Sequence, residues 1–202
     1  MRSRSTSAST VGSWLGRLFR LDFSVLAEVR ANPSATSAAI VVVLVASLFA
    51  GLGSWLWALQ SFVDDRDAFI RAFIVGSLLQ TVVWFSWVYV AYLVLTQGYG
   101  ARQDFGEMTR AMGFAFAPVA LSVFIFVGAL AVPIGLISFG MAILLTNAAI
   151  QEVSDADVRE ATIANLAGFA VFAIVMGGCA NIFEVDSIGG LAPGIFFFSL
   201  DL

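Results

Sequence analysis

A few uncharged polar side chains lie inside long apolar segments of this sequence, where they could carry chemistry. Gln80, Asn147 and Asn165 each fall within a run of apolar residues long enough to cross a membrane. One interpretation is hydrogen bonding between neighbouring helices, worth about 0.6–2 kcal/mol for each contact. The other is a weak ligand or ion site in the middle of the membrane. Residue types favour the first interpretation and leave the second open.

The side chains on which most enzymes depend are scarce. The chain has no histidine, and Cys179 is its one cysteine, so a disulfide within the chain and a cysteine-based zinc site are excluded. The five apolar cores carry no ionisable residue, although intramembrane proteases and proton-coupled transporters need such groups at that depth. The acidic cluster at 64–67 is typical of a solvated loop. We therefore predict no catalytic residue, no metal site and no cofactor, and a protein that is not an enzyme.

The composition is that of a membrane protein. Of the 202 residues, 60% are hydrophobic and 12% are charged, about half the charged fraction of a soluble domain. The mean hydropathy is +0.94. A bilayer is the solvent that suits so much apolar surface. The net charge of −4 shows no basic face, so we expect no nucleic-acid partner.

Five apolar segments set the expected fold, an all-α, polytopic membrane helix bundle of about five transmembrane helices. The segments are 36–59, 72–96, 111–130, 132–150 and 161–183. The third and fourth are continuous in hydropathy, but one helix of that length would reach about 60 Å, twice the hydrocarbon thickness. Pro133 and Gly135 disfavour a continuous helix. We therefore predict a tight hairpin at 131–135 between two spans of a membrane domain over 33–185.

The N-terminal region divides into two parts. Residues 1–13 are rich in Ser, Thr and Arg without periodicity, which predicts a disordered cytoplasmic tail. Residues 14–32 place apolar side chains at helical spacing, which predicts an amphipathic helix. This helix either lies in the membrane interface or packs against the bundle. In either case Trp14, Arg17 and Arg20 are candidate interfacial or partner contacts.

The arginines predict an orientation. An N-terminus in the cytoplasm places eight arginines on that side, whereas the opposite side keeps Arg66 and Arg71. Five spans then put the C-terminal tail, 186–202, outside. Arg102 and Arg110 lie in the cytoplasmic loop 97–110 and are further candidate contacts. Two helix caps are expected at this side, Asp104 with Glu107 and Ser154 with Asp157.

The ordered features resemble one known family. They are EVRANPSATSAA before the first span, GYGARQDFGEMTRAMGFAFAP before the third, and QEVSDADVREATIANL before the fifth, together with closely paired third and fourth spans. Over roughly 19–185 the sequence resembles the YIP domain family of Ypt/Rab-interacting membrane proteins, in its prokaryotic form. The resemblance implies a scaffold or partner-binding protein without catalytic residues. Its eukaryotic members are linked to Rab GTPases and vesicle trafficking, but the DLYGP-type segment typical of them is missing here, which leaves Rab binding open.

The sequence therefore predicts a non-enzymatic membrane scaffold, or a module that contacts proteins and lipids, in a prokaryotic plasma membrane. The expected partners are membrane lipids, a protein that the sequence does not name, and a second copy of the chain as an open alternative. The alternative function is a small permease or channel subunit that uses Gln80, Asn147 and Asn165 along a pathway.

Overall fold

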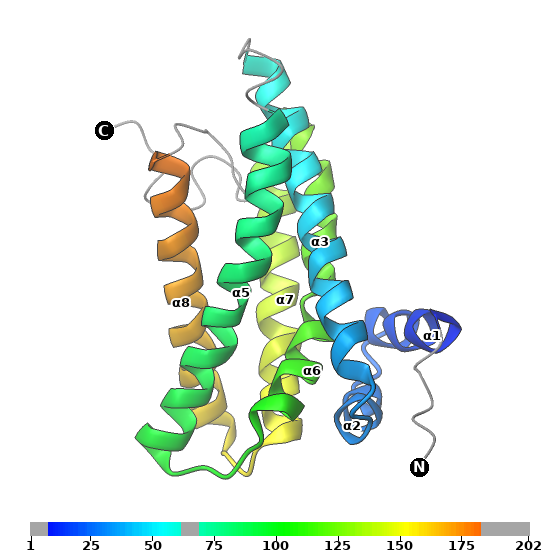
Figure 1. Ribbon diagram of the computed structural model, residues 1–202, viewed down its shortest axis with the longest axis vertical. Helices are drawn as coiled ribbons and strands as arrows, with labels where there is room; N and C mark the ends of the chain where they lie inside the picture. The colour runs from blue at the N-terminus through cyan, green and yellow to red at the C-terminus, as the bar shows by residue number, and fades with distance from the viewer. Residues whose placement is uncertain (1–7, 62–68, 183–202) are drawn as a thin grey trace.

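The structure, a computed structural model, describes residues 8–61 and 69–182, and its regular elements in those ranges are helices (Figure 1). This confirms the predicted all-α class. The elements are α1 (Ala8–Phe19), α2 (Ser24–Ala31), α3 (Ala35–Ala58), η1 (Leu59–Ser61), η2 (Phe69–Val75), α5 (Gly76–Leu93), η3 (Val94–Tyr99), α6 (Phe105–Ala115), η4 (Ala117–Phe126), η5 (Gly128–Leu130), α7 (Ala131–Val153) and α8 (Val158–Ile182). Of these, η2 and η3 are π-helical, and η1, η4 and η5 are 3₁₀ helices.

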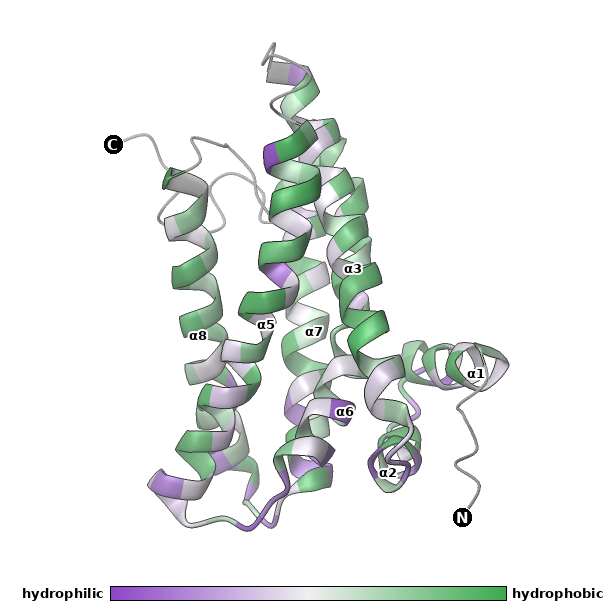
Figure 2. Ribbon diagram, in the orientation of Figure 1, coloured by the Kyte–Doolittle hydropathy of each residue, from purple (hydrophilic) through white to green (hydrophobic). Residues whose placement is uncertain are grey.

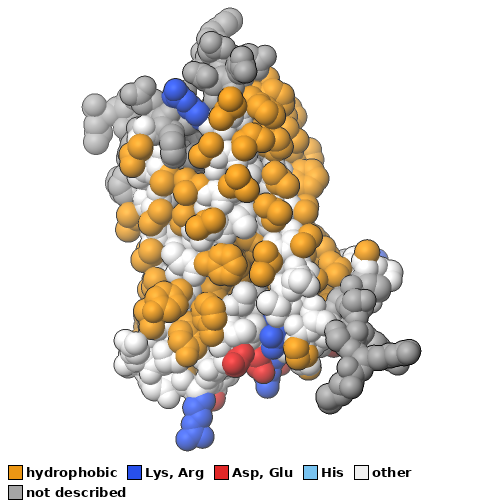
Figure 3. Space-filling model, viewed as in Figure 1, with side chains coloured by type: hydrophobic (Ala, Val, Ile, Leu, Met, Phe, Trp, Pro, Cys, Tyr) orange, Lys and Arg blue, Asp and Glu red, His pale blue; other side chains and the backbone are white. Residues whose placement is uncertain are grey.

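Five of these helical segments are long and apolar enough to cross a membrane, as predicted. They are Ala35–Ala58, Phe69–Tyr99, Phe105–Phe126, Gly128–Val153 and Val158–Cys179. Hydrophobic residues cover the length of the bundle in Figure 2, and apolar side chains coat the wall of the molecule in Figure 3. The protein is therefore a multi-pass helical membrane protein.

One end of the bundle carries α1, α2 and the starts of α6 and α8, and we call it the α1–α2 end (Figure 1). Charged side chains gather at this end of the face seen in Figure 3. The described residues at the opposite end include Arg71, in η2. Within residues 8–61 and 69–182, the charged side chains other than Arg71 therefore lie at the α1–α2 end.

The turn between the third and fourth spans is not where the sequence placed it. The chain leaves η4 at Val127, where φ is −78° and ψ is 91°, and passes through η5 into α7 at Ala131. Pro133 therefore lies in the first turn of α7, where a helix leaves its N–H groups without partners and a fixed φ is tolerated. The predicted hairpin between two spans is confirmed, but its position at 131–135 is wrong, since the turn lies at 127–130 and the proline starts a helix instead of ending one.

The N-terminal predictions also need correction. Helix α1 begins at Ala8, so the tail predicted over 1–13 is helical from that residue. The helix predicted over 14–32 is two helices, α1 and α2, and α1 lies across the axis of the bundle (Figure 1). Residues 1–7 and the tail at 186–202 lie outside the described residues.

Small residues let the helices of the bundle approach closely. A methyl group added at Gly168 of α8 would lie 2.5 Å from the carbonyl oxygen of Trp87 in α5, and one added at Gly113 of α6 would lie 2.8 Å from Ala39 Cβ in α3. Ala46, Ala50 and Ala164 are buried by their own chain. These small residues therefore serve packing within one molecule.

Candidate functional site: the α1–α2 end and the polar contacts of the bundle

Helices α1 and α2 are joined by a turn that contains a strained leucine. The Asp22 N–H donates to Arg17 O at 3.1 Å, and the Leu21 N–H donates to Leu18 O at 2.9 Å. This is the Schellman pattern, which needs a left-handed residue after the helix. Leu21 occupies that position with φ of 60°, the one non-glycine residue with a positive φ in the described ranges. Glycine would adopt this conformation without the cost of about 1–2 kcal/mol that a side chain adds.

Arg17 holds the two helices together. Its Nε donates to Asp22 Oδ2 at 2.8 Å, its Nη1 to Glu28 Oε1 at 2.6 Å and its Nη2 to Ser24 Oγ at 2.9 Å. Glu28 also accepts from Trp14 Nε1 at 3.1 Å. A planar guanidinium suits such a fan of acceptors, because its donors point in fixed directions.

The same hydrogen bonds change the acidity of the two carboxyl groups. The Ser24 hydroxyl and then Arg17 lower the pKa of Asp22 below its ordinary value of 3.8. Arg17 lowers the pKa of Glu28 below its ordinary value of 4.5; partial desolvation opposes this shift and Trp14 adds to it. Both groups therefore favour the paired arrangement when they are ionised.

The pairing of α1 with α2 is expected to weaken in acid. Because both pKa values are lower when the helices are paired, the contribution of the two carboxylates is full above about pH 5 and is lost as the pH falls through the lowered values. Spin labels at Ser13→Cys and Ala27→Cys, in a Cys179→Ser background, should give one narrow distance at pH 6 and a broad distribution at pH 3. The Glu28→Gln variant should show a smaller change. A distribution that stays equally narrow from pH 6 to pH 3 would contradict this role.

Buried side chains dock the pair of helices on the bundle. Trp14 and Leu18 of α1 and Leu26 of α2 are almost completely buried, and the Trp14 ring meets Phe114 of α6 edge to face at 5.5 Å. Of the two alternatives for this region, the structure favours packing against the bundle. Because its apolar face is buried in this way, a side chain such as Trp14 is not available to a partner.

Arg30 and Arg110 join α2 to the spans. Arg30 Nε pairs with Glu107 Oε2 at 3.0 Å, and its Nη1 donates to the Glu152 carbonyl at 2.6 Å. Arg110 is buried, with 8% of its surface exposed, and its Nη2 donates to the Arg30 carbonyl at 3.0 Å. The sequence predicts Arg110 as a surface contact, but it is a buried structural cation in the middle of α6.

Arg20 and Arg102 remain exposed at the α1–α2 end. The backbone N–H of Arg102 donates to Asp155 Oδ1 at 2.6 Å, and Gln103 forms an isolated bridge with Ser154. These contacts fix the loop before α6 against the loop before α8. Of the five candidate contact residues, Arg20 and Arg102 are the two whose side chains are exposed at this surface.

The two predicted caps have different outcomes. Asp104 caps α6 by accepting from the Glu107 N–H at 2.9 Å, as predicted. At α8 the reciprocal pair is Asp157 with Glu160, since Asp157 Oδ1 accepts from the Glu160 N–H at 2.8 Å and Glu160 Oε2 accepts from the Asp157 N–H at 3.2 Å. Ser154 instead donates to the Ile150 carbonyl at the end of α7. The cap predicted at Ser154 is wrong by one turn.

Asn165 joins three helices inside the bundle. Its Oδ1 accepts from Trp87 Nε1 of α5 at 2.9 Å and lies 3.0 Å from the Thr146 hydroxyl of α7. Its Nδ2 donates to the Ile143 carbonyl at 2.8 Å. The side chain is fully engaged, so the structure supports the interhelical interpretation for this residue.

Gln80 lies in different surroundings. It is completely buried, and neither atom of its amide has a hydrogen-bond partner within the described residues. Ser77 Oγ, which lies against Gly51 of α3, and Ser47 Oγ are unpaired in the same sense. Because α3 and α5 are antiparallel, Ser47 and Gln80 both lie about one turn, or roughly 4.5–6 Å, from the Gly51–Ser77 level in the same direction. Sequence reasoning missed the two serines, which are common in apolar helices.

An aromatic layer separates Gln80 from Asn165. It consists of Trp84, Trp87, Phe116, Phe139, Phe169 and Phe172, whose neighbouring ring centroids lie 5.0–6.3 Å apart. Gln80 comes before the aromatic residues of α5, and α5 runs toward the α1–α2 end of the bundle (Figure 1). Asn165 comes before those of α8, which runs away from that end, so Gln80 and Asn165 lie on opposite sides of the layer. The polar groups on its two sides therefore do not form a continuous pathway among the described residues.

Asn147 belongs to neither group. It lines a hollow on the outside of α7, and its Oδ1 is buried without a hydrogen-bond partner in the described ranges.

Residues 8–61 and 69–182 contain no group of three His, Cys, Asp or Glu side chains that could hold a metal ion.

The comparisons with known proteins add no relative. No family model, no curated protein and no solved structure matches this chain. The resemblance to the YIP family therefore stays a prediction.

Proposed function

We propose that this protein is a non-enzymatic membrane scaffold that binds a protein partner at its α1–α2 end. One observation carries the proposal: Arg17 holds α1 and α2 together, and buried side chains and the ion pair of Arg30 with Glu107 hold this pair on the bundle. A pair of helices fixed in this way presents a surface of constant shape, which reduces the entropy lost on binding. The aromatic layer also favours a scaffold, because it closes the bundle to a polar pathway.

We place the α1–α2 end in the cytoplasm. Arg17, Arg20 and Arg30 lie on α1 and α2 or directly after them, and Arg102 and Arg159 lie near the starts of α6 and α8 at the same end. Positive residues next to membrane spans are retained on the cytoplasmic side. The five spans, the paired third and fourth spans and this orientation are also what supports membership of the YIP family, which we propose on the sequence resemblance.

Crosslinking at this surface tests the scaffold role. A photoreactive amino acid at Arg20 or Arg102 should capture the same protein in repeated experiments in native membranes, because both side chains are exposed at the α1–α2 end. The same group at Leu78, which is exposed on α5 within the span, serves as the control and should capture lipid. Capture of lipid and varying neighbours from all three positions would contradict the proposal.

A small permease or channel subunit is the second candidate, and the unpaired amide of Gln80 beside Ser77 favours it. A buried polar group without a partner is unfavourable by about 1–3 kcal/mol unless water or a solute meets it. Purified protein in proteoliposomes should then carry a solute, and Gln80→Ala should reduce the flux. The scaffold proposal expects no flux with any solute, so a flux that falls in this variant would decide for the permease.

A further inference from the structure

Three large apolar side chains are exposed within five residues at the α1–α2 end. Phe19, Leu21 and Phe23 lie at the end of α1 and in the connection to α2, and the described residues leave 43–60% of each uncovered. Apolar surface in water is unfavourable, and a water-facing surface rarely gathers such side chains in one place. Residues 19–23, which we call the connecting segment, therefore favour an apolar medium.

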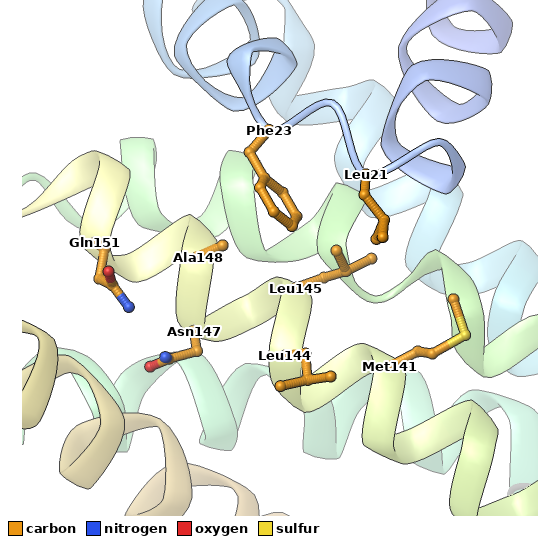
Figure 4. Close-up of a pocket in the computed structure, with 8 residues that line it drawn as sticks. All are labelled: Leu21, Phe23, Met141, Leu144, Leu145, Asn147, Ala148 and Gln151. Atoms are coloured by element: carbon orange, nitrogen blue, oxygen red, sulfur yellow. The ribbon is translucent and has the colours of Figure 1, made fainter.

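The connecting segment lies beside membrane spans on two sides. Phe19 lines one hollow with Val41 of α3, which is exposed on the outer wall of that span. Leu21 and Phe23 line a second hollow with Leu144, which is exposed on the outer wall of α7, and Figure 4 shows both side chains pointing toward that helix. The outer wall of a span faces lipid. The connecting segment therefore continues a lipid-facing surface.

The two spans give the connecting segment a similar depth. Val41 is six residues from the start of α3 at Ala35, or about 9 Å along the helix. Leu144 is nine residues from the end of α7 at Val153, or about 13–14 Å. The first and fourth spans are about 36 Å and 39 Å long, and the hydrocarbon layer is about 30 Å thick. With each span centred in that layer, the connecting segment lies about 6–9 Å inside its boundary.

Helix α1 leaves half of its apolar arc for the same medium. At about 100° per residue, an arc of about 140° carries, in order, Trp14, Leu18, Leu15 and Phe19. The first two are buried against the bundle, whereas the last two line the hollow beside α3. Docking on the bundle therefore uses one half of the apolar arc, and the other half faces the lipid side.

The opposite arc of α1 is polar and faces the surface of the membrane. It carries Ser13 and Arg20, both exposed. The hollow beside α3 extends from Val41 to Phe49, toward the middle of that span, so the arc of α1 turned away from it faces the end of the bundle. Arginine at such a boundary keeps its stem along apolar surface and its charge among the lipid phosphates. This division of the side chains is typical of a helix that lies in the plane of the membrane.

We propose that the connecting segment and the adjoining arc of α1 are embedded in the leaflet at the α1–α2 end, with Phe19, Leu21 and Phe23 among the acyl chains and Arg20 at the head groups. The occupant of this surface is the lipid of the bilayer. The proposal rests neither on the scaffold role nor on which side of the membrane is the cytoplasm. It leaves α2 and the polar arc of α1 as the part of this end that is open to a soluble partner.

Electron paramagnetic resonance of the full chain, in vesicles of phosphatidylethanolamine and phosphatidylglycerol, measures the depth. Spin labels at Phe19→Cys and Phe23→Cys, in a Cys179→Ser background, should be relaxed by oxygen, which concentrates among the acyl chains, and hardly by a water-soluble nickel chelate. The ratio of the two effects should place both labels about 6–9 Å inside the hydrocarbon boundary.

Three further labels serve as matched controls. Ser13→Cys, on the opposite arc of α1, and Arg102→Cys, at the same end of the bundle, should respond to the nickel chelate. Leu144→Cys, on the outer wall of α7, should respond to oxygen. The proposal is overturned if the labels at 19 and 23 respond to nickel as Arg102→Cys does. It is equally overturned if they are shielded from both reagents, because protein and not lipid would then cover them.

A second measurement leaves the connecting segment unchanged. Phosphatidylcholine with a diazirine in its acyl chain should label the wild-type protein within residues 19–23 on irradiation, as mass spectrometry of the peptides would show. The loop at 154–157, before α8, should stay unlabelled. Labelling of the α7 wall around Leu144 without labelling at 19–23 would contradict the proposal, even if a cysteine variant failed to fold.

Discussion

Gly168→Ala is expected to lower the thermal stability of the protein in detergent more than Gly178→Ala on the same helix. The new Cβ would lie 2.5 Å from the Trp87 carbonyl oxygen and 2.6 Å from Trp87 Cδ1. Both atoms are held, the first by the α5 backbone and the second by a fully buried ring, so α5 and α8 must move apart. Overpacking of this kind typically costs about 1–3 kcal/mol. Thermal unfolding followed by tryptophan fluorescence would measure the loss.

Gly178→Ala is the matched control on the same helix. Among the described residues no atom outside its own helix lies within 4 Å of the added methyl group. The substitution should therefore be neutral or should stabilise α8 by up to about 1 kcal/mol, since alanine favours a helix. Equal melting temperatures for the two variants would show that α8 does not pack on Trp87 as described.

Asn165→Leu is expected to have the second largest effect. The substitution removes the side-chain acceptor of Trp87 Nε1 and one donor to the Ile143 carbonyl. Trp87 Nε1 keeps the Asn165 backbone carbonyl at 3.1 Å, and the Ile143 carbonyl keeps the Thr146 hydroxyl at 3.1 Å. The expected loss is about 0.6–1.7 kcal/mol, the net worth of a hydrogen bond between helices in a membrane bundle, because each group keeps its second partner. Thermal unfolding of the purified variant, with Thr162→Val as a polar-to-apolar control on an exposed face of α8, measures it.

A double-mutant cycle isolates the contact between helices. Trp87→Phe keeps an aromatic ring but removes the Nε1 donor, so Asn165→Leu in that background should cost less than it does alone. The coupling should be about 0.6–1.7 kcal/mol, the range measured for hydrogen bonds inside membrane bundles. Additive losses would mean that Asn165 and Trp87 do not act as a pair.

The five spans could be predicted because they depend on local composition. A run of about 20 apolar residues has few alternatives to a transmembrane helix. The cap at Asp104 was predictable for a similar reason, since residue type and spacing over three positions determine it. The interhelical contact of Asn165 was one of two open interpretations, and its partners on α5 and α7 are far away in the sequence.

The errors arose where neighbouring segments decide the outcome. Pro133 can end a helix or begin one, and its position in the first turn of α7 depends on where the chain leaves η4. Leu21 adopts a conformation that leucine rarely takes, so no residue signal marked the break between α1 and α2. Arginine is usually a surface residue, but α2 covers Arg110 and the Arg30 carbonyl of α2 accepts from its guanidinium. None of these facts is local to the residue concerned.

We propose that the docked α1–α2 pair is the surface on which the protein acts. Photocrosslinking from Arg20 in native membranes, compared between the wild type and Arg17→Glu, tests it most directly. The substitution places three carboxylates together where Arg17 now pairs with Asp22 and Glu28, so it should undock α1. Arg159→Glu makes the same charge change at an exposed residue of the same end. We expect a single partner to be captured by the wild type and by Arg159→Glu and to be lost in Arg17→Glu; equal capture in all three, or no repeated partner in any, would contradict the claim.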